Sequence, residues 1–240
     1  MILFIYHYSI YFLNEFLGKI QLPGNSSNFL LIIAHPDDEC MFFGPTLLNL
    51  IANNRGSNIR ILLLSSGQTD SHVDRLLEFR TACDYLQITN ISITPLFKDG
   101  FKHNWPIKLI ADQIEYISKS FNIDTILTFD AYGVSGHPNH KAVYRAALNC
   151  CKSSNIQHRL HLKSVSVFRK YLGPIDIWYS VIVNKLCCSD SIVLTANKSQ
   201  NQQIKEALFK HKSQMVWYRR LFYAQLSRYM WINDLVEITE

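Results

Sequence analysis

Residues 29–39 read Phe-Leu-Leu-Ile-Ile-Ala-His-Pro-Asp-Asp-Glu, an apolar run that passes directly into a cluster of imidazole and carboxylate groups. A short continuous apolar run predicts a strand that is buried on both faces. Polar groups at the end of such a strand lie where open α/β sheets bind their ligands. The stretch therefore predicts the first strand of a parallel sheet and one side of a functional site.

Predicted strands and helices alternate along the rest of the chain. Further strands are expected at residues 59–65, 91–97, 123–129, 164–168 and 191–195, and helices at 46–54, 73–86, 106–120, 138–151 and 202–212. Strands separated by helices predict the α/β class, with a Rossmann-like three-layer fold and a mostly parallel, doubly wound sheet. Because the chain has 240 residues and no internal repeat, we expect a single domain over residues 28–240.

The composition excludes some classes of protein. Apolar residues make up 48% of the chain and charged residues 18%, which excludes a disordered protein. The formal net charge of +5 fits an anionic partner, although many proteins without one share this excess. The sequence has no Cys-x-x-Cys, Gly-x-Gly-x-x-Gly or Walker loop, so we expect neither a thiolate zinc site nor nucleotide binding. We interpret the six cysteines as mostly reduced and buried, as in a domain that faces the cytosol.

A membrane-anchor candidate and a linker make up residues 1–27. Residues 1–17 are rich in Ile, Leu, Phe and Tyr but also contain His7, Asn14 and Glu15. The run is shorter than the about 20 apolar residues of a typical transmembrane helix, and it lacks the basic start and cleavage site of a signal peptide. An interfacial anchor, a weak single span, a segment held by a partner and an apolar helix packed on the core all remain open. We favour membrane association because so aromatic a segment suits an interface.

Four predicted strands are followed by polar loops, at residues 35–39, 65–67, 99–100 and 130–140. The carboxyl ends of parallel strands meet at one edge of a sheet. We therefore expect these four loops to converge on a single site.

Two of these loops together offer the groups of a metal site. His35 and Asp38 supply a nitrogen and a carboxylate oxygen, which are ligand types that zinc accepts, and His140 supplies a third ligand. A position then remains for water, and Asp37 is free to take a proton from it. His137, about one turn before His140, would face a substrate carbonyl. Each cluster alone is common on surfaces and at helix caps, but their joint position behind two strands of one sheet favours a functional site.

Several motifs resemble the PIG-L family of zinc-dependent de-N-acetylases. They are residues 34–43 and 133–140, together with 128–130, 164–171, 217–221 and 227–230. The resemblance covers the chain from about residue 28 to about residue 235. Within the family, the motifs near the C-terminus resemble the eukaryotic branch that acts on N-acetylglucosaminyl-phosphatidylinositol.

The resemblance implies an amidase-type hydrolase that converts this glycolipid to glucosaminyl-phosphatidylinositol and acetate, an early step of GPI-anchor biosynthesis. It implies that His35, Asp38 and His140 hold Zn²⁺ or another divalent metal. Asp37 is then the base, and His137 is an imidazolium that stabilises the oxyanion. The implied location is the endoplasmic reticulum membrane, with the catalytic domain facing the cytosol. The oligomeric state is not predicted.

Four further residues are expected to support the site. The resemblance places Arg75 and Glu78 near the sugar, although an (i, i+3) surface ion pair is an equally good interpretation. Asp99 is expected to accept hydrogen bonds from sugar hydroxyls, although Asp-Gly is also ordinary turn chemistry. Asp130 is expected to support His140 from behind, because a metal-bound imidazole needs an acceptor on its other nitrogen.

Basic and aromatic side chains are interleaved in the C-terminal part of the chain. This composition suits an anionic bilayer surface, and the alternative is a terminal helix packed on the core with solvated charges. The residues are Lys205, Lys210, Lys212, Arg219, Arg220 and Arg228 with Phe209, Trp217, Tyr218, Phe222, Tyr223, Tyr229 and Trp231.

The expected partners are therefore a phosphatidylinositol glycolipid and a membrane surface, and no nucleic acid. Two other functions remain open at this point. One is a deacetylase of the same fold that acts on a soluble N-acetylglucosamine conjugate, and the other is a non-catalytic binding subunit.

Overall fold

The computed structural model describes residues 26–53, 58–67, 74–150, 156–186 and 191–238. Within them lies one seven-stranded sheet, in the order β3-β2-β1-β4-β5-β7-β6. Neighbouring strands from β3 to β5 are parallel, whereas β7 runs antiparallel to both β5 and β6. The strands are β1 Phe29–Ile33, β2 Ile59–Ser65, β3 Ile91–Phe97, β4 Thr125–Phe129, β5 His158–Leu162, β6 Ile192–Thr195 and β7 Ile232–Glu237.

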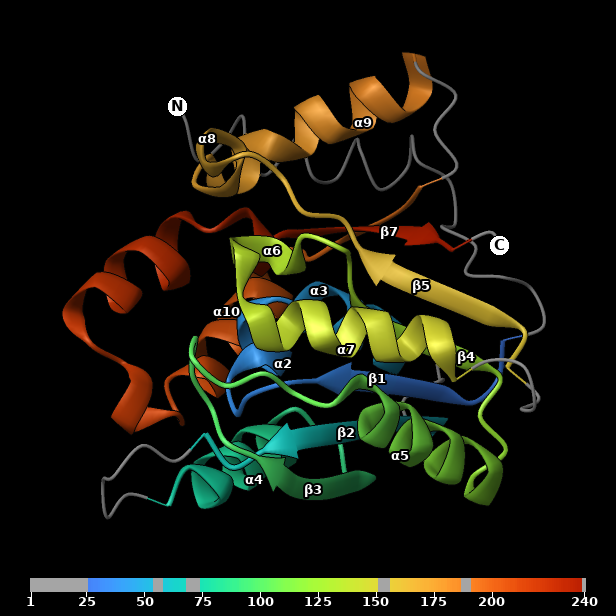
Figure 1. The fold of residues 1–240 in the computed structure, drawn as a ribbon. Helices are drawn as coiled ribbons and strands as arrows, with labels where there is room; N and C mark the ends of the chain where they lie inside the picture. The colour runs from blue at the N-terminus through green and yellow to red at the C-terminus, as the bar shows by residue number, and fades with distance from the viewer. Residues whose placement is uncertain (1–25, 54–57, 68–73, 151–155, 187–190, 239–240) are drawn as a thin grey trace.

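Helices cover both faces of this sheet (Figure 1). Alternate side chains of β1 point to opposite faces, because side chains alternate along a strand. Leu30 and Ile32 belong to the core shared with α5 Ile107–Ser120 and α7 Pro138–Asn149, whereas Phe29, Leu31 and Ile33 belong to the core shared with α3 Gly44–Ala52, α4 Arg75–Tyr85 and α10 Lys198–Leu208. The three-layer α/β fold with a mostly parallel sheet, predicted from the sequence, is confirmed.

Further helical segments connect these elements. They are α2 Asp38–Met41, α6 Gly133–Gly136, α8 Val167–Lys170, α9 Asp176–Leu186, the 3₁₀ segments η2 Gly173–Ile175, η3 Lys212–Gln214 and η5 Arg228–Met230, and the π-helical segment η4 Arg219–Leu226. None of the helices in the described part of the chain has both the length and the apolarity needed to cross a bilayer. The predicted anchor at residues 1–17 lies outside the described residues.

The strand order places the site at the centre of the sheet. β1 lies between β2 and β4, so the chain continues to one side after β1 and returns later to the other side. Such a reversal opens a crevice at the carboxyl ends of the two central strands, and ligands bind there in open α/β sheets. The loops after β1 and β4 carry the two predicted metal-binding motifs, and they meet at this crevice.

Two predicted details of the sheet are wrong. Residues 164–168 were expected to form a strand, but that position in the sheet belongs to β5, and residues 167–170 form α8. β7 was not predicted. Its sequence contains Asn233 and Asp234, both buried: Thr46, 187 positions away, donates to Asn233, and the nearby Arg228 donates to Asp234. A strand with buried polar side chains does not show the apolar run that single-sequence reasoning depends on.

Candidate active site

Asp38 lies at the centre of the site, at the start of α2. Its Oδ2 accepts hydrogen bonds from the backbone N–H groups of Ala34 at 3.1 Å and His35 at 2.8 Å. Burial of Asp38 favours the protonated acid, but the neighbouring imidazoles of His140 and His35 hold its pKa well below the usual value. The side chain is therefore an oriented carboxylate at the end of the central strand.

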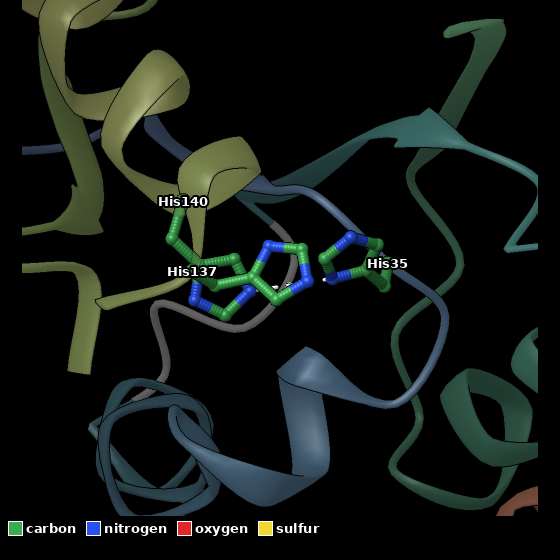
Figure 2. Close-up of side chains that lie close together, drawn as sticks. All are labelled: His35, His137 and His140. Carbon is green, nitrogen blue, oxygen red and sulfur yellow. Dashed lines mark hydrogen bonds between the residues drawn. The ribbon is translucent and has the colours of Figure 1, made fainter. Parts of the chain in front are cut away.

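The predicted ligands His35, Asp38 and His140 lie together, and Figure 2 shows the two imidazoles facing each other. Nε2 of His140 is 3.3 Å from Nδ1 of His35 and 3.4 Å from Oδ1 of Asp38, and His35 Nδ1 is 3.5 Å from Oδ2 of Asp38. Ligands at about 2.0–2.2 Å from a tetrahedral zinc ion are themselves about 3.3–3.5 Å apart. The donor atoms therefore fit a four-coordinate zinc site with one position left for another ligand.

Hydrogen bonds from behind orient both imidazoles. Nδ1 of His140 lies 3.0 Å from the carbonyl oxygen of Gly133, so its N–H donates there and Nε2 is left as a ligand atom. The same ring stacks on Phe129 with centroids 3.9 Å apart. Nε2 of His35 lies 2.9 Å from Oδ1 of Asp99, which leaves Nδ1 of His35 as its ligand atom.

Asp130 and Asp99 therefore have other contacts than those expected from the sequence. The acceptor for His140 is Gly133, and Asp130 acts one step farther away: its Oδ1 accepts the backbone N–H of Gly133 at 2.8 Å and so shapes the loop. Asp99 lines the cavity, but it supports His35 through Oδ1 and lies 3.4 Å from Arg75 through Oδ2. Burial opposes ionisation of Asp99, yet His35 and Arg75 lower its pKa.

The carboxylates of Asp38 and Asp99 favour a positive charge on the imidazole of His35. Burial opposes charge on His35, but Asp38 and Asp99 raise its pKa to about 10. A metal ion would supply that charge instead, and its binding would release the proton. The chemistry of the site therefore agrees with the donor spacing in indicating a cation site.

Asp37, the predicted base, lies beside this cluster and has a strained backbone with φ 120°. Its N–H donates to Oε2 of Glu39 at 3.1 Å, and its Oδ2 accepts from Nη1 of Arg219 at 2.6 Å. Burial raises the pKa of Asp37 above its usual value, and Arg219 acts in the opposite direction. Asp37 is thus a buried carboxyl group whose ionised form depends on a guanidinium from η4.

Arg219 and His211 are the functional residues that the sequence analysis missed. Arg219 was placed among basic residues facing a bilayer, although the structure directs it into the site. His211 Nε2 is 2.6 Å from Oε1 of Glu39, and both side chains are fully buried. Both residues lie more than 170 positions along the chain from their partners, and only the motif around residues 217–221 pointed to that region.

Arg75 and Glu78, which were expected to lie together near the sugar, contact different parts of the chain. Arg75 is buried, and its guanidinium donates to the carbonyl oxygens of Gly67 and Pro36, so it ties the loops after β1 and β2 together beside the site. Glu78 does not line the cavity. It accepts hydrogen bonds from Ser213 N and Oγ at 2.9 and 2.6 Å, so it holds η3 in place instead of facing a substrate.

His137 lies on the open side of the cluster, with its ring centroid 4.7 Å from that of His35 and 5.1 Å from that of His140 (Figure 2). Burial and the neighbouring imidazoles His35 and His140 lower its pKa to about 4. Its Nδ1 accepts the N–H of Asn139 at 3.3 Å, which leaves Nε2–H as the free donor. The lowered pKa favours a neutral imidazole, whereas the family resemblance implies an imidazolium at His137.

A cavity of about 190 Å³ brings these groups together. Three of the four loops that were expected to converge contribute residues to its lining, and the loop after β2 does not. Residues from the loops after β1, β3 and β4 line it, and Arg75 joins the loop after β2 to them. The lining residues are His35, Asp37, Asp38, Met41, Phe42, Arg75, Asp99, Phe101, Ser135, His137, His140, Gln214, Arg219 and Tyr223.

A doubly wound sheet with this cluster at its crevice defines the chain as a hydrolase of the α/β deacetylase class. The N,N'-diacetylchitobiose deacetylase from Pyrococcus horikoshii has the same fold, with a TM-score of 0.63 at 13% identity, covering 96% of this chain and 91% of that one. Residues 30–151 match the PIG-L family model, described as GlcNAc-PI de-N-acetylase.

Relatives extend the match over almost the whole chain. The probable N-acetylglucosaminyl-phosphatidylinositol de-N-acetylase of Schizosaccharomyces pombe is 36% identical over 218 residues, which cover 88% of this chain and 87% of that protein. The N-acetylglucosaminyl-phosphatidylinositol de-N-acetylase of Bos taurus is 35% identical over 223 residues, covering 89% and 85%. The chain therefore belongs to the PIG-L family, as its motifs predicted.

Gly133 offers a test of the metal site. A methyl group there would lie 2.7 Å from Cβ of His140, and the residue has φ +68°. We expect Gly133→Ala to weaken Zn²⁺ binding about 10- to 100-fold, as for other changes behind a metal ligand, measured by titration calorimetry of the metal-free chain. Gly136→Ala is the control, because φ is +77° there but the nearest atom is Tyr132 at 3.9 Å. Equal affinities of the two variants would contradict the assigned role of His140.

Proposed function

We propose that the chain removes the acetyl group from N-acetylglucosaminyl-phosphatidylinositol, giving glucosaminyl-phosphatidylinositol and acetate in GPI-anchor biosynthesis. The observation that carries the proposal is the cluster of His35, Asp38 and His140 beside the buried Asp37, in a chain whose relatives bear that activity in their names. Residues 28–240 form the catalytic domain in this proposal.

Zn²⁺ is the metal that the donor set favours, with two imidazole nitrogens 3.3 Å apart and a carboxylate whose Oδ1 and Oδ2 lie 3.4 and 3.5 Å from one nitrogen each. When bound, such a metal supplies a Lewis acid and makes a water molecule acidic enough to lose its proton near neutral pH. Other divalent ions accept the same ligands, so metal identity is part of the test below.

In this proposal Asp37 carries out the proton transfers, and His137 stabilises the negative charge that develops on the substrate. Oδ2 of Asp37 is held by Arg219, so Oδ1 takes the proton of the attacking water. Nε2–H of His137 donates to the amide carbonyl oxygen as negative charge develops on it. Because His137 is neutral and its Nδ1 is held by Asn139, the protonated Asp37 delivers the proton to the leaving amine.

An apolar surface beside the cavity is the face that we propose meets the bilayer. Segments 167–182 and 216–226 both contribute to it, and they adjoin where the rings of Tyr171 and Phe222 lie 5.7 Å apart. Its exposed side chains are Val167, Phe168, Leu172, Ile175, Trp178, Tyr179, Ile182, Val216, Trp217, Tyr218, Leu221, Phe222 and Leu226.

This surface narrows the membrane interpretation made from the sequence. Of the aromatic residues in that interpretation, Trp217, Tyr218 and Phe222 belong to this surface, whereas Tyr229 and Trp231 are buried. Two of the basic residues also face inward: Arg219 binds Asp37, and Arg228 is fully buried against Asp176 and Asp234. A contiguous exposed apolar patch rimmed by polar residues is typical of a contact with a membrane or a partner. A position on the cytosolic side of the endoplasmic reticulum membrane, with residues 1–17 as an anchor, completes the proposal.

Metal removal and two substitutions test the reaction. We expect chelation of the purified chain to abolish acetate release from N-acetylglucosaminyl-phosphatidylinositol, and Zn²⁺ to restore it better than other divalent ions. His140→Ala should lose bound metal and activity together. Asp37→Asn should keep the metal but lose about 10²- to 10⁴-fold in kcat, because it removes only the proton acceptor.

Three outcomes would contradict this mechanism or function. Loss of metal from Asp37→Asn would exclude its role as base. Equal efficiency on a water-soluble N-acetylglucosamine conjugate would favour the soluble-substrate alternative. An inactive protein that no divalent ion activates would favour the non-catalytic one.

The ion pair between Asp37 and Arg219 predicts a shift in pH dependence. Loss of the cation makes the carboxylate less favourable, so the pKa of Asp37 rises and a higher pH is needed to ionise the base. We expect Arg219→Gln to move the acidic limb of the kcat/KM profile up by about 1 pH unit or more. Arg220→Gln is the control, since Nε of Arg220 donates to the Met215 carbonyl at 2.8 Å. An unmoved limb in Arg219→Gln would show that Asp37 does not limit the rate at acidic pH.

The apolar surface predicts binding to vesicles. Phe168 and Trp217 are 89% and 73% exposed, and burial of such side chains in a bilayer gives about 1.5–3 kcal/mol each. We expect the double variant Phe168→Ser, Trp217→Ser to bind vesicles of phosphatidylcholine and phosphatidylinositol at least about tenfold more weakly in a flotation assay. Tyr116→Ser on α5 is the control, with 66% exposure. Wild-type binding by the double variant would place the membrane contact elsewhere in the chain.

A further inference from the structure

A second cavity, of about 600 Å³, adjoins the catalytic one. Ser135 lines both cavities, so they meet on the loop between β4 and α7. Phe42 separates their deeper parts: its ring centroid is 5.8 Å from that of His140 and 5.9 Å from Nζ of Lys170. A group in the second cavity would therefore lie close to one held at the catalytic cluster.

Lys170, at the end of α8, is the cation that lines this cavity. Its side chain is buried, with 6% of the residue exposed. Nζ lies 5.1 to 5.9 Å from the ring centroids of Tyr223, Phe42 and Tyr171, which stabilise a cation without using its N–H groups. Within the described part of the chain, no hydrogen bond or ion pair engages the ammonium group.

An ammonium group has three donors, and their burial without acceptors is unfavourable. Burial accordingly lowers the pKa of Lys170. An anion in the cavity would accept these hydrogen bonds and offset the lost hydration. The position therefore favours a negatively charged ligand.

Asp130 is the carboxylate that lines the same cavity, and both of its oxygens accept hydrogen bonds from its own loop and from Ser164. Its Oδ1 accepts from the N–H groups of Tyr132 and Gly133 and from Oγ of Ser164. Its Oδ2 accepts from the N–H of Ser164 at 2.7 Å. These donors engage both oxygens of Asp130, and the other polar groups that line the cavity are hydroxyls and the ammonium group of Lys170.

We propose that this second cavity binds the phosphodiester of the substrate headgroup, with the ammonium of Lys170 as its counter-ion. The proposal rests on the proposed function, in which the sugar bearing the acetyl group is joined through inositol to a phosphodiester. The acetamido group occupies the catalytic cavity and the phosphate the adjoining one. Val167 and Phe168, in the same helix as Lys170 and both highly exposed, then lie on the side where the acyl chains enter the bilayer.

The test compares three substrates: the intact glycolipid, its deacylated water-soluble phosphodiester, and N-acetylglucosaminyl-inositol, which lacks the phosphate. We expect Lys170→Met to reduce kcat/KM for both phosphodiesters, relative to the phosphate-free substrate, by about 10- to 100-fold, the range of a hydrogen bond to a charged group. The loss should be mainly in KM. Lys170→Arg should recover part of it, and Lys108→Met, which removes an exposed charge on α5, should leave the ratio unaltered.

The outcomes separate this proposal from the proposed function. Absence of deacetylation by the wild-type chain on every substrate defeats the function itself. Equal losses on all three substrates, or no loss, overturn the phosphate site alone. A loss confined to the intact glycolipid assigns Lys170 to the bilayer surface instead and also overturns it. On wild-type protein, glycerophosphoinositol should inhibit more strongly than inositol, and equal inhibition would overturn the site without any variant.

Discussion

The carboxylate of Asp38 is the group on which the site depends. It fixes the end of β1 through two backbone N–H groups, and it faces two imidazoles that lie 105 residues apart in the sequence. Because β1 and β4 are neighbours at the point where strand order reverses, the fold brings His35 and His140 to the same carboxylate. The strand order places the two histidines close together, and the carboxylate of Asp38 lies within 3.5 Å of a ring nitrogen of each.

Residues from the C-terminal part of the chain hold Asp37 and Glu39 in place. The family model matches residues 30–151, which contain the proposed metal ligands and Asp37. Arg219 and His211 lie beyond that range, yet one pairs with Asp37 and the other with Glu39, whose carboxylate also binds the N–H of Asp37. The segment that completes the catalytic carboxylate thus also carries part of the apolar surface beside the cavity.

Sequence reasoning was reliable where a local pattern carries the information. The apolar runs located β1 to β4, and the family motifs located His35, Asp38 and His140. It was unreliable where a long-range partner decides the role of a residue. Glu78 and Arg75 look like one pair in sequence, but their partners are Ser213 on one side and Gly67 with Pro36 on the other. No periodicity encodes such contacts, nor the turn of Arg219 away from solvent.

Asp37 is held in a backbone conformation that favours glycine. A non-glycine residue at φ 120° costs on the order of 1–3 kcal/mol, which glycine would avoid. Glycine at this position would avoid that cost, but it would leave the guanidinium groups of Arg219 and Arg75 without the carboxylate that they face. The strain at Asp37 is therefore offset by contacts that only a carboxyl group at this position can make.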